Sequence, residues 1–154
     1  GAALYGVAPQ KSAPNPMAQV VSLKGKIIQS RTIDTPRCVG YGATHRAEPG
    51  RRIATVAVGY ADGYLRSLSG SARAHVGNTP VQVVGRVSMD LITIDVTDVP
   101  ESAVRPGAYV DLIGPHHGID ALAQEAGTIA YEILTALGSR TARHYIGHDN
   151  GHVS

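Results

Sequence analysis

The sequence predicts a mainly β fold, a sandwich or a closed barrel, with one short helical segment near residues 120–137. Short stretches rich in Val, Ile, Leu and Thr recur at regular spacing, as in antiparallel sandwiches and barrels. Clusters of Gly, Pro and Asp separate these stretches and predict turns. Apolar residues follow helical spacing only from residue 119 onward.

Residues 1–18 carry little regular pattern. Residues 1–6 resemble the tail of an apolar strand, and Pro9, Pro14 and Pro16 then predict a linker or loop. The following 129 positions, 19–147, form the expected β domain, and residues 148–154 are expected to be a polar tail. We expect strands at 19–33, 39–47, 53–60, 72–76, 81–87, 91–96, 108–113 and 141–146.

Three local signals refine this pattern. Gly25 indicates a bulge in the first long strand, and Asp62-Gly63 predicts a hairpin-type turn. In the helical segment we expect Asp120 as the N-cap and an interruption at Gly127. A second helix, with Thr128 as its cap, is expected to follow and to end at Gly138.

Composition narrows the class of protein. The chain has 154 residues, 43% hydrophobic and 17% charged, which suits one folded domain. A net charge of +2, with scattered arginines, argues against nucleic acid as a partner. No apolar run approaches the roughly 18 residues that span a bilayer. The lone Cys38 excludes an internal disulfide and fits a reducing compartment, so we expect a cytoplasmic location.

The chain has no Trp or Phe, so its seven tyrosines are the only aromatic residues. Several of them are therefore expected in the core. Tyr41 lies between Gly40 and Gly42, which favours close approach of a ligand or of another backbone. Spacing alone favours a packed strand tyrosine over a catalytic one.

Two further segments carry candidate binding residues. Tyr60, Tyr64 and Arg66 surround the predicted turn, where Arg66 could attract a carboxylate; an ordinary hairpin explains them equally well. Between two predicted strands, Arg86 and the backbone near Met89 could bind an anion, although a turn with a core methionine is the simpler interpretation.

No metal site is predicted. His144, His148 and His152 are spaced by four, but intervening glycines break a helix there, and no Cys or Glu cluster supports ligation.

Five motifs in order resemble the C-terminal domain of alanine racemase, a family of pyridoxal-phosphate enzymes that interconvert L- and D-alanine. They cover nearly the whole chain. The motifs are Ala3-Leu4-Tyr5-Gly6, Gly40-Tyr41-Gly42-Ala43-Thr44, Val58-Gly59-Tyr60-Ala61-Asp62-Gly63, Val84-Gly85-Arg86-Val87-Ser88-Met89-Asp90 and Thr128-Ile129-Ala130-Tyr131-Glu132.

The resemblance implies a fold and a set of partners. The family has an N-terminal α/β barrel that holds the cofactor and a Greek-key-like β domain, and it acts as a head-to-tail homodimer on an amino-acid substrate. Residues 1–18 then correspond to the end of the last strand of the α/β barrel plus the interdomain linker. The product, D-alanine, supplies peptidoglycan synthesis.

The resemblance also implies site residues. Tyr41 matches the catalytic tyrosine, which contacts the substrate in the partner subunit's site and exchanges its α-proton on one face. Met89 matches the residue whose backbone amide holds the substrate carboxylate. Tyr131 matches the tyrosine whose hydroxyl contacts the cofactor phosphate. The residues that match the substrate access corridor are Tyr60, Arg66, Arg86 and Ile129.

The lysine that binds the cofactor belongs to the α/β barrel in this family, and Lys11, Lys24 and Lys26 do not replace it. The chain alone is therefore predicted to be inactive. The family often has cysteine where Ser88 stands, so thiol sensitivity is not expected there. Two alternatives stay open: a racemase of other or broader specificity, such as for serine, and a non-catalytic dimerisation or binding module on the same scaffold.

Overall fold

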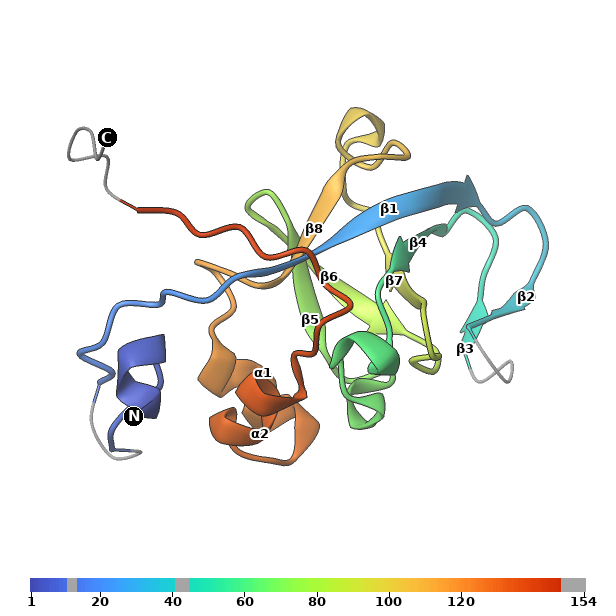
Figure 1. The fold of residues 1–154 in the computed structure, drawn as a ribbon. Helices are drawn as coiled ribbons and strands as arrows, with labels where there is room; N and C mark the ends of the chain where they lie inside the picture. The colour runs from blue at the N-terminus through green and yellow to red at the C-terminus, as the bar shows by residue number, and fades with distance from the viewer. Residues whose placement is uncertain (11–13, 41–44, 148–154) are drawn as a thin grey trace.

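The computed structural model describes residues 1–10, 14–40 and 45–147 (Figure 1). Eight strands, two α-helices and four 3-10 helices (η) lie in these ranges. Their bounds are η1 Ala2–Tyr5, β1 Leu23–Thr32, β2 Arg37–Val39, β3 His45–Ala47, β4 Arg52–Ala57, η2 Tyr60–Asp62, η3 Arg66–Leu68, β5 Arg73–Val76, β6 Thr79–Val84, β7 Ile92–Asp95, η4 Glu101–Ala103, β8 Tyr109–Ile113, α1 Ile119–Ala126 and α2 Ala130–Ala136.

Six of the strands close into an antiparallel barrel in the order β1-β4-β7-β6-β5-β8, with β8 returning to pair with β1. β5, β6 and β7 form a meander, and β8 then lies beside β5, which is a Greek-key arrangement. The prediction of a mainly β fold with a closed barrel is thus confirmed. Closure removes the exposed strand edges that an open sheet of this size would present.

The long strand β1 carries the alternation that the barrel requires. Leu23 and Ile27 point into the core, whereas Lys24 and Lys26 face outward. The bulge predicted at Gly25 is wrong, because Gly25 pairs in register with Val110 and the register shifts lie on either side of it. A side chain at Gly25 would instead collide with a core valine.

The strand predicted over residues 39–47 is also wrong. The structure has two short strands there, β2 and β3, which pair antiparallel with Val39 opposite His45. This two-stranded sheet lies outside the barrel (Figure 1). It has a small hydrophobic cluster of its own, made of Ile33, Val39, Ala47, Ile53 and Val84.

The helical segment is confirmed, including the second helix expected after Gly127, although the N-cap of α2 is Ile129 and not Thr128. Gly127 adopts the left-handed conformation, with a φ of 70°, and ends α1, so the predicted interruption at this residue is confirmed. Asp120 lies in the first turn of α1, whose N-cap is Gly118, and its carboxylate accepts a hydrogen bond from the Ala8 N–H at 2.9 Å. Asp120 therefore ties the N-terminal segment to α1 instead of capping the helix.

Three other local predictions fail. Residues 1–6 form no strand, because Ala2–Tyr5 make a 3-10 helix. Residues 141–146 form no strand either and run along the surface, mostly exposed. At Asp62-Gly63 the chain passes through two successive 3-10 helices, η2 and η3, so no hairpin forms.

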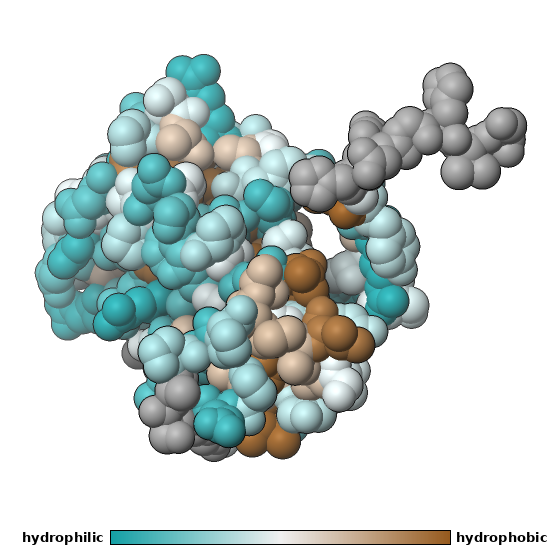
Figure 2. Space-filling view, turned by 90° about the vertical axis from the view of Figure 1, so that its left-hand side faces the viewer, coloured by the Kyte–Doolittle hydropathy of each residue, from teal (hydrophilic) through white to brown (hydrophobic). Residues whose placement is uncertain are grey.

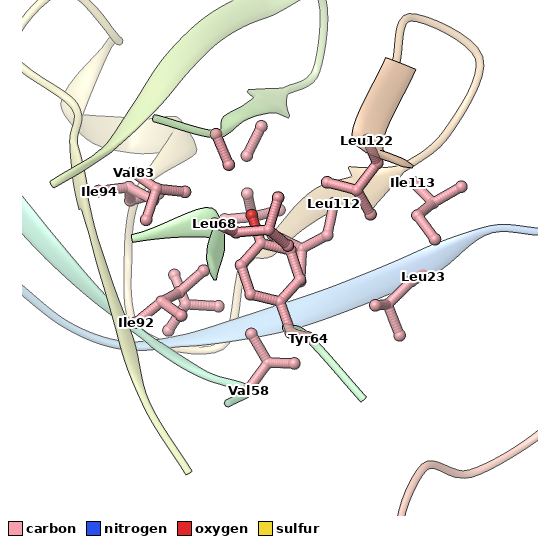
Figure 3. Close-up of a cluster of buried hydrophobic side chains, with 14 of the residues drawn as sticks. Leu23, Val58, Tyr64, Leu68, Val83, Ile92, Ile94, Leu112, Ile113 and Leu122 are labelled. Atoms are coloured by element: carbon pink, nitrogen blue, oxygen red, sulfur yellow. The ribbon is translucent and has the colours of Figure 1, made fainter. Parts of the chain in front are cut away.

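The barrel core is aliphatic, as the absence of Phe and Trp predicts, with one aromatic exception. Tyr64, expected near a loop tip, is only 1% exposed and lies among the core side chains (Figure 3). Burial, together with the charge of Glu125, raises the pKa of Tyr64 far above its usual range. Its hydroxyl has no hydrogen-bond partner among the described residues. Tyr64 is therefore a core residue.

Among the described residues, no helix combines the length and the apolar character that a membrane span requires.

Candidate functional site

The segment 85–90, between β6 and β7, is held tightly by the chain around Gly40. A Cβ added to Gly40 would lie 2.9 Å from the Gly85 Cα, and one added to Gly85 would lie 2.8 Å from the Val39 carbonyl oxygen. Both glycines also have positive φ, of 80° and 73°. Only glycine fits this crossing, because a side chain at either position would force the two backbones apart.

A second crossing holds the other end of the same segment. A Cβ on Gly59 would lie 2.3 Å from the Met89 carbonyl oxygen. The N–H of Tyr60 donates to Ser88 O and that of Ala61 to Met89 O, both at 3.0 Å. Residues 85–90 are thus fixed through backbone contacts to two glycine motifs that lie far apart in the sequence.

Ser88 shapes the turn that presents Met89. Its N–H donates to the Leu91 carbonyl at 3.0 Å, and its hydroxyl accepts from the Leu91 N–H at 3.1 Å. No hydrogen bond joins the Met89 N–H to a described residue. The Met89 side chain is 52% exposed, so the interpretation of Met89 as a core methionine is wrong.

These contacts surround a shallow pocket of about 260 Å³ beside the crossing. Its lining combines residues with polar side chains, such as Arg86 and Ser88, with apolar ones, such as Leu91. The complete lining is Gly40, Thr55, Arg86, Ser88, Leu91, Ile92 and Thr93. Tyr41 directly follows the lining residue Gly40 in sequence but lies outside the described residues.

Two of the predicted corridor residues lie on the turns next to segment 85–90. Tyr60 begins η2 and is 42% exposed. Arg66 begins η3, and the hydroxyl of Ser69 joins this turn to the segment: it donates to Arg66 O at 2.5 Å and accepts from the Val87 N–H at 3.0 Å. The fold therefore brings Tyr60, Arg66, Arg86 and Met89 to one end of the barrel.

The other two predicted residues, Ile129 and Tyr131, lie at α2 and form a separate group. Both are more than half exposed. Tyr131 lines an open hollow of about 370 Å³ together with Ala2, Tyr5, Leu134, Thr135 and Arg143. Ile129 does not line it. Figure 2 shows apolar residues gathered within a hydrophilic surface on the side that carries η1.

Arg140, which follows α2, is a site residue that was not predicted from the sequence. Its guanidinium contacts two carboxylates: Nε lies 3.3 Å from Asp62 Oδ1, and Nη2 donates to Asp90 Oδ1 at 2.6 Å. The hydrogen bond to Asp90 raises the pKa of Arg140, so the side chain stays charged. Motif Gly85–Asp90 ends in one of these aspartates, but nothing in the sequence indicates that a residue 50 positions later pairs with it.

The lysines that the structure describes, Lys24 and Lys26, lie on the outer surface of the β-barrel. Lys24 forms an ion pair with Asp111 at 2.9 Å, and the Lys26 amine lies 5.5 Å from the centre of the Tyr109 ring. Lys11 lies outside the described residues. Neither Lys24 nor Lys26 lines either hollow.

The described residues contain no group of three or more His, Cys, Asp or Glu side chains arranged to hold a metal ion. His117 is buried, with its Nε2 lying 3.2 Å from Glu125. Desolvation, and then the neighbouring His117 and His116, lower the pKa of the nearby His75. His148 and His152 lie outside the described residues.

Fold and site together define an antiparallel β-barrel domain with two separate candidate binding surfaces, one at the end of the barrel and one beside α2. The alanine racemase C-terminal domain family matches residues 20–145. A Rhodospirillum rubrum protein named alanine racemase is 58% identical over 147 residues, which is 96% of this chain and 39% of the relative. The Brucella canis alanine racemase is 44% identical over 167 residues, which is 100% of this chain and 42% of that relative.

Solved structures agree in fold. The crystal structure of alanine racemase from Bartonella henselae with covalently bound pyridoxal phosphate matches with a TM-score of 0.88 and 39% identity, over 95% of this chain and 40% of that one. Biosynthetic alanine racemase from Pseudomonas aeruginosa matches with a TM-score of 0.87 and 36% identity, over 96% and 41%. The chain belongs to the alanine racemase C-terminal domain family. It spans about two fifths of the length of these relatives.

Proposed function

We propose that this chain is the C-terminal domain of a pyridoxal-phosphate-dependent alanine racemase and presents Tyr41 as a catalytic residue to the active site of a partner subunit. The observation that carries the proposal is the convergence of the three glycine motifs at residues 40, 59 and 85 on one end of the barrel. Membership of the family and relatives named alanine racemase support it.

Racemisation explains why a tyrosine is needed at this position. Removal and return of the α-proton on the same face regenerate the starting enantiomer, so the reaction needs one base on each face of the substrate. A tyrosine with its ordinary pKa near 10 is ionised only about one time in a thousand at neutral pH. Tyr41 therefore requires cationic surroundings that lower its pKa, supplied when the site is assembled.

The backbone N–H of Met89 is proposed to receive the substrate carboxylate. A backbone N–H without an internal acceptor is suited to donate to an anion, and the Met89 N–H has no acceptor among the described residues. The exposed Arg86 adds positive charge beside it. Arg86, together with Tyr60 and Arg66 on the adjoining turns, would line the path by which the substrate reaches this position. Ile129 would be contributed from the other surface.

The residues of this chain fit the phosphate end of the cofactor and not its aldehyde. Arg143 and Tyr131 both line the hollow beside η1, and a guanidinium and a phenol hydroxyl are suitable donors to a phosphate. Lys24 and Lys26 lie elsewhere, and we assign the covalent attachment to the N-terminal domain, as the family resemblance implies. The bound cofactor supplies the electron sink that makes the α-proton of an amino acid acidic enough to exchange.

The proposal includes the assembly and its location. The residues presented to the partner subunit and those that hold the cofactor lie on different surfaces, which a head-to-tail homodimer of full-length chains would bring together in each site. The lone cysteine fits a cytoplasmic enzyme, whose product D-alanine would serve peptidoglycan synthesis.

The test is Tyr41→Phe in the full-length protein, with Tyr109→Phe as the matched control, because Tyr109 is an exposed tyrosine on β8. Exchange of the α-proton with deuterated solvent is measured from each enantiomer separately. We expect Tyr41→Phe to lose roughly 10²- to 10⁴-fold in exchange from one enantiomer, the usual contribution of a general acid or base. Exchange rates equal to those of the control for both enantiomers would contradict the catalytic role and favour the non-catalytic module.

A further inference from the structure

Arg140 is the one cation among the described residues that contacts both turns at the end of the barrel. It forms ion pairs with Asp62, in the turn that carries Tyr60, and with Asp90, in the turn that carries Met89. We propose that Arg140 is a positioning residue for the substrate site, fixing the Tyr60 and Met89 turns relative to each other. This inference rests on the proposed function, since it assigns a role within the same site.

The Asp62 carboxylate transmits the contact to the backbone. Its Oδ2 accepts the Gly59 N–H at 2.9 Å, while its Oδ1 faces Arg140 Nε. Gly59 is the residue whose backbone closely approaches Met89 O. Asp62 is only 14% exposed, so this carboxylate is largely shielded from competing water. Arg140 therefore acts on the backbone next to Tyr60, and not only on a surface side chain.

The turn is also held from the side of α2. A Cβ on Gly63 would lie 2.3 Å from the Ala136 carbonyl oxygen, so the Tyr60 turn rests directly on the last turn of that helix. Arg140 lies four residues after Ala136 and contacts the same turn through its ion pair with Asp62. The end of α2 and Arg140 together leave the Tyr60 turn little freedom to move away from Met89.

The geometry requires arginine in particular. The guanidinium uses separate nitrogens, Nε and Nη2, for two carboxylates that come from different segments. A planar fork of donors can serve both at once, whereas a lysine amine is a single point of charge. The partner that the fork bonds most closely, Asp90, directly follows Met89 in sequence.

An isolated surface ion pair contributes little to the free energy of unfolding. The effect of losing Arg140 on substrate binding therefore distinguishes a positioning role from a purely stabilising one. If Arg140 only stabilised the fold, its loss would lower the melting temperature and leave substrate binding unchanged. If it positions the two turns, its loss weakens substrate binding and leaves unchanged the covalent attachment of the cofactor, which we assign to the N-terminal domain.

The experiment compares Arg140→Gln, Arg140→Lys and Arg51→Gln in the full-length enzyme. Arg51 is the matched control, because it pairs with Asp95 at 3.3 Å and is similarly exposed. It directly precedes β4, at the opposite end of that strand from the turn that carries Tyr60. We expect Arg140→Gln to raise the KM for alanine and to lower kcat/KM roughly 10- to 100-fold, as small displacements of positioning groups do. The absorption band of the bound cofactor should be unchanged, and Arg140→Lys should restore part of the loss.

Asp90→Asn provides a second, milder variant if Arg140→Gln fails to fold, since Asp90 is exposed and only one contact is removed. We expect it to raise KM in the same direction, and the double variant Arg140→Gln/Asp90→Asn to be less impaired than the two separate losses multiplied together. A KM for Arg140→Gln and Asp90→Asn equal to that of Arg51→Gln would overturn the positioning role.

The outcomes for Tyr41 and Arg140 separate the two proposals. Normal proton exchange by Tyr41→Phe sinks the proposed function, whatever Arg140 does. Loss of exchange by Tyr41→Phe, combined with control-like kinetics for Arg140→Gln, removes only the positioning role.

Discussion

The two candidate surfaces of this domain are built in opposite ways. At the end of the barrel, segment 85–90 is held by backbone: two glycine crossings and hydrogen bonds from the N–H groups of Tyr60 and Ala61. Beside α2, the hollow is formed by exposed side chains, among them Tyr5, Tyr131 and Arg143. The difference predicts that at the turn of Met89 a change of side chain is tolerated better than a change of backbone, and that the hollow beside α2 shows the reverse.

The largest effect is expected from Gly59→Ala. Gly59 has an extended φ of −154°, which any residue adopts, so the cost comes only from the Cβ placed 2.3 Å from Met89 O. Because backbone must move, we expect a loss of about 3 kcal/mol or more in the free energy of unfolding. Gly50→Ala is the control: it has a positive φ but open space around it, and should cost only about 1 kcal/mol. Urea denaturation measures both, and equal losses would mean that the crossing is not the constraint.

Substitutions of one side chain on each surface should have smaller effects, on cofactor binding at one surface and on the KM for alanine at the other. Tyr131→Phe removes one proposed donor to the cofactor phosphate and should weaken cofactor binding roughly 10-fold or more, in line with a hydrogen bond to a charged group. Met89→Ala removes an exposed side chain and keeps the backbone N–H, so the KM for alanine should change less than about threefold. Cofactor titration and steady-state kinetics of the full-length enzyme measure these. A large change in the KM for alanine in Met89→Ala would contradict the view that Met89 acts through its backbone.

The smallest effect concerns the core that supports both surfaces. Burial raises the pKa of Tyr64, so the folded state keeps its proton where the unfolded chain, titrating near pH 10, loses it. The contribution of Tyr64 is therefore fully present below about pH 10 and is lost as the pH rises further. Tyr64→Phe should make the free energy of unfolding less sensitive to pH above 10, whereas Tyr109→Phe, at an exposed site, should not. Its cost at neutral pH should be within about 1 kcal/mol, because the buried hydroxyl has no partner among the described residues.

The sequence predicted the architecture well and the local details less well. Alternation in strands such as β7, where Ile92 and Ile94 are buried and Thr93 is not, is a local signal that survives folding. The failures at residues 1–6 and 141–146 have a shared cause: both segments have the composition of strands, but neither is paired in a described sheet. The composition of a segment indicates only its tendency to form a strand, whereas the rest of the chain decides whether that strand finds a partner in a sheet.

The candidate site also has features that the sequence predicted and features that it did not. Its glycine motifs were visible because close backbone approach leaves a mark in the sequence. Their convergence depends on Gly40 meeting Gly85 and on Gly59 meeting Met89, which only the closed barrel produces. Arg140 was missed because arginine is common on surfaces, and its partners Asp62 and Asp90 are remote in sequence.

The β2–β3 sheet has a further consequence for how such a domain can change over time. Its hydrophobic cluster around Val39 and Ala47 is distinct from the barrel core, although Ile53 and Val84 reach it from barrel strands. Substitutions that repack this small cluster can adjust the segment leading into Tyr41 without disturbing the interior of the barrel. The scaffold and the presentation of Tyr41, the proposed catalytic residue, can therefore be tuned as two nearly independent modules.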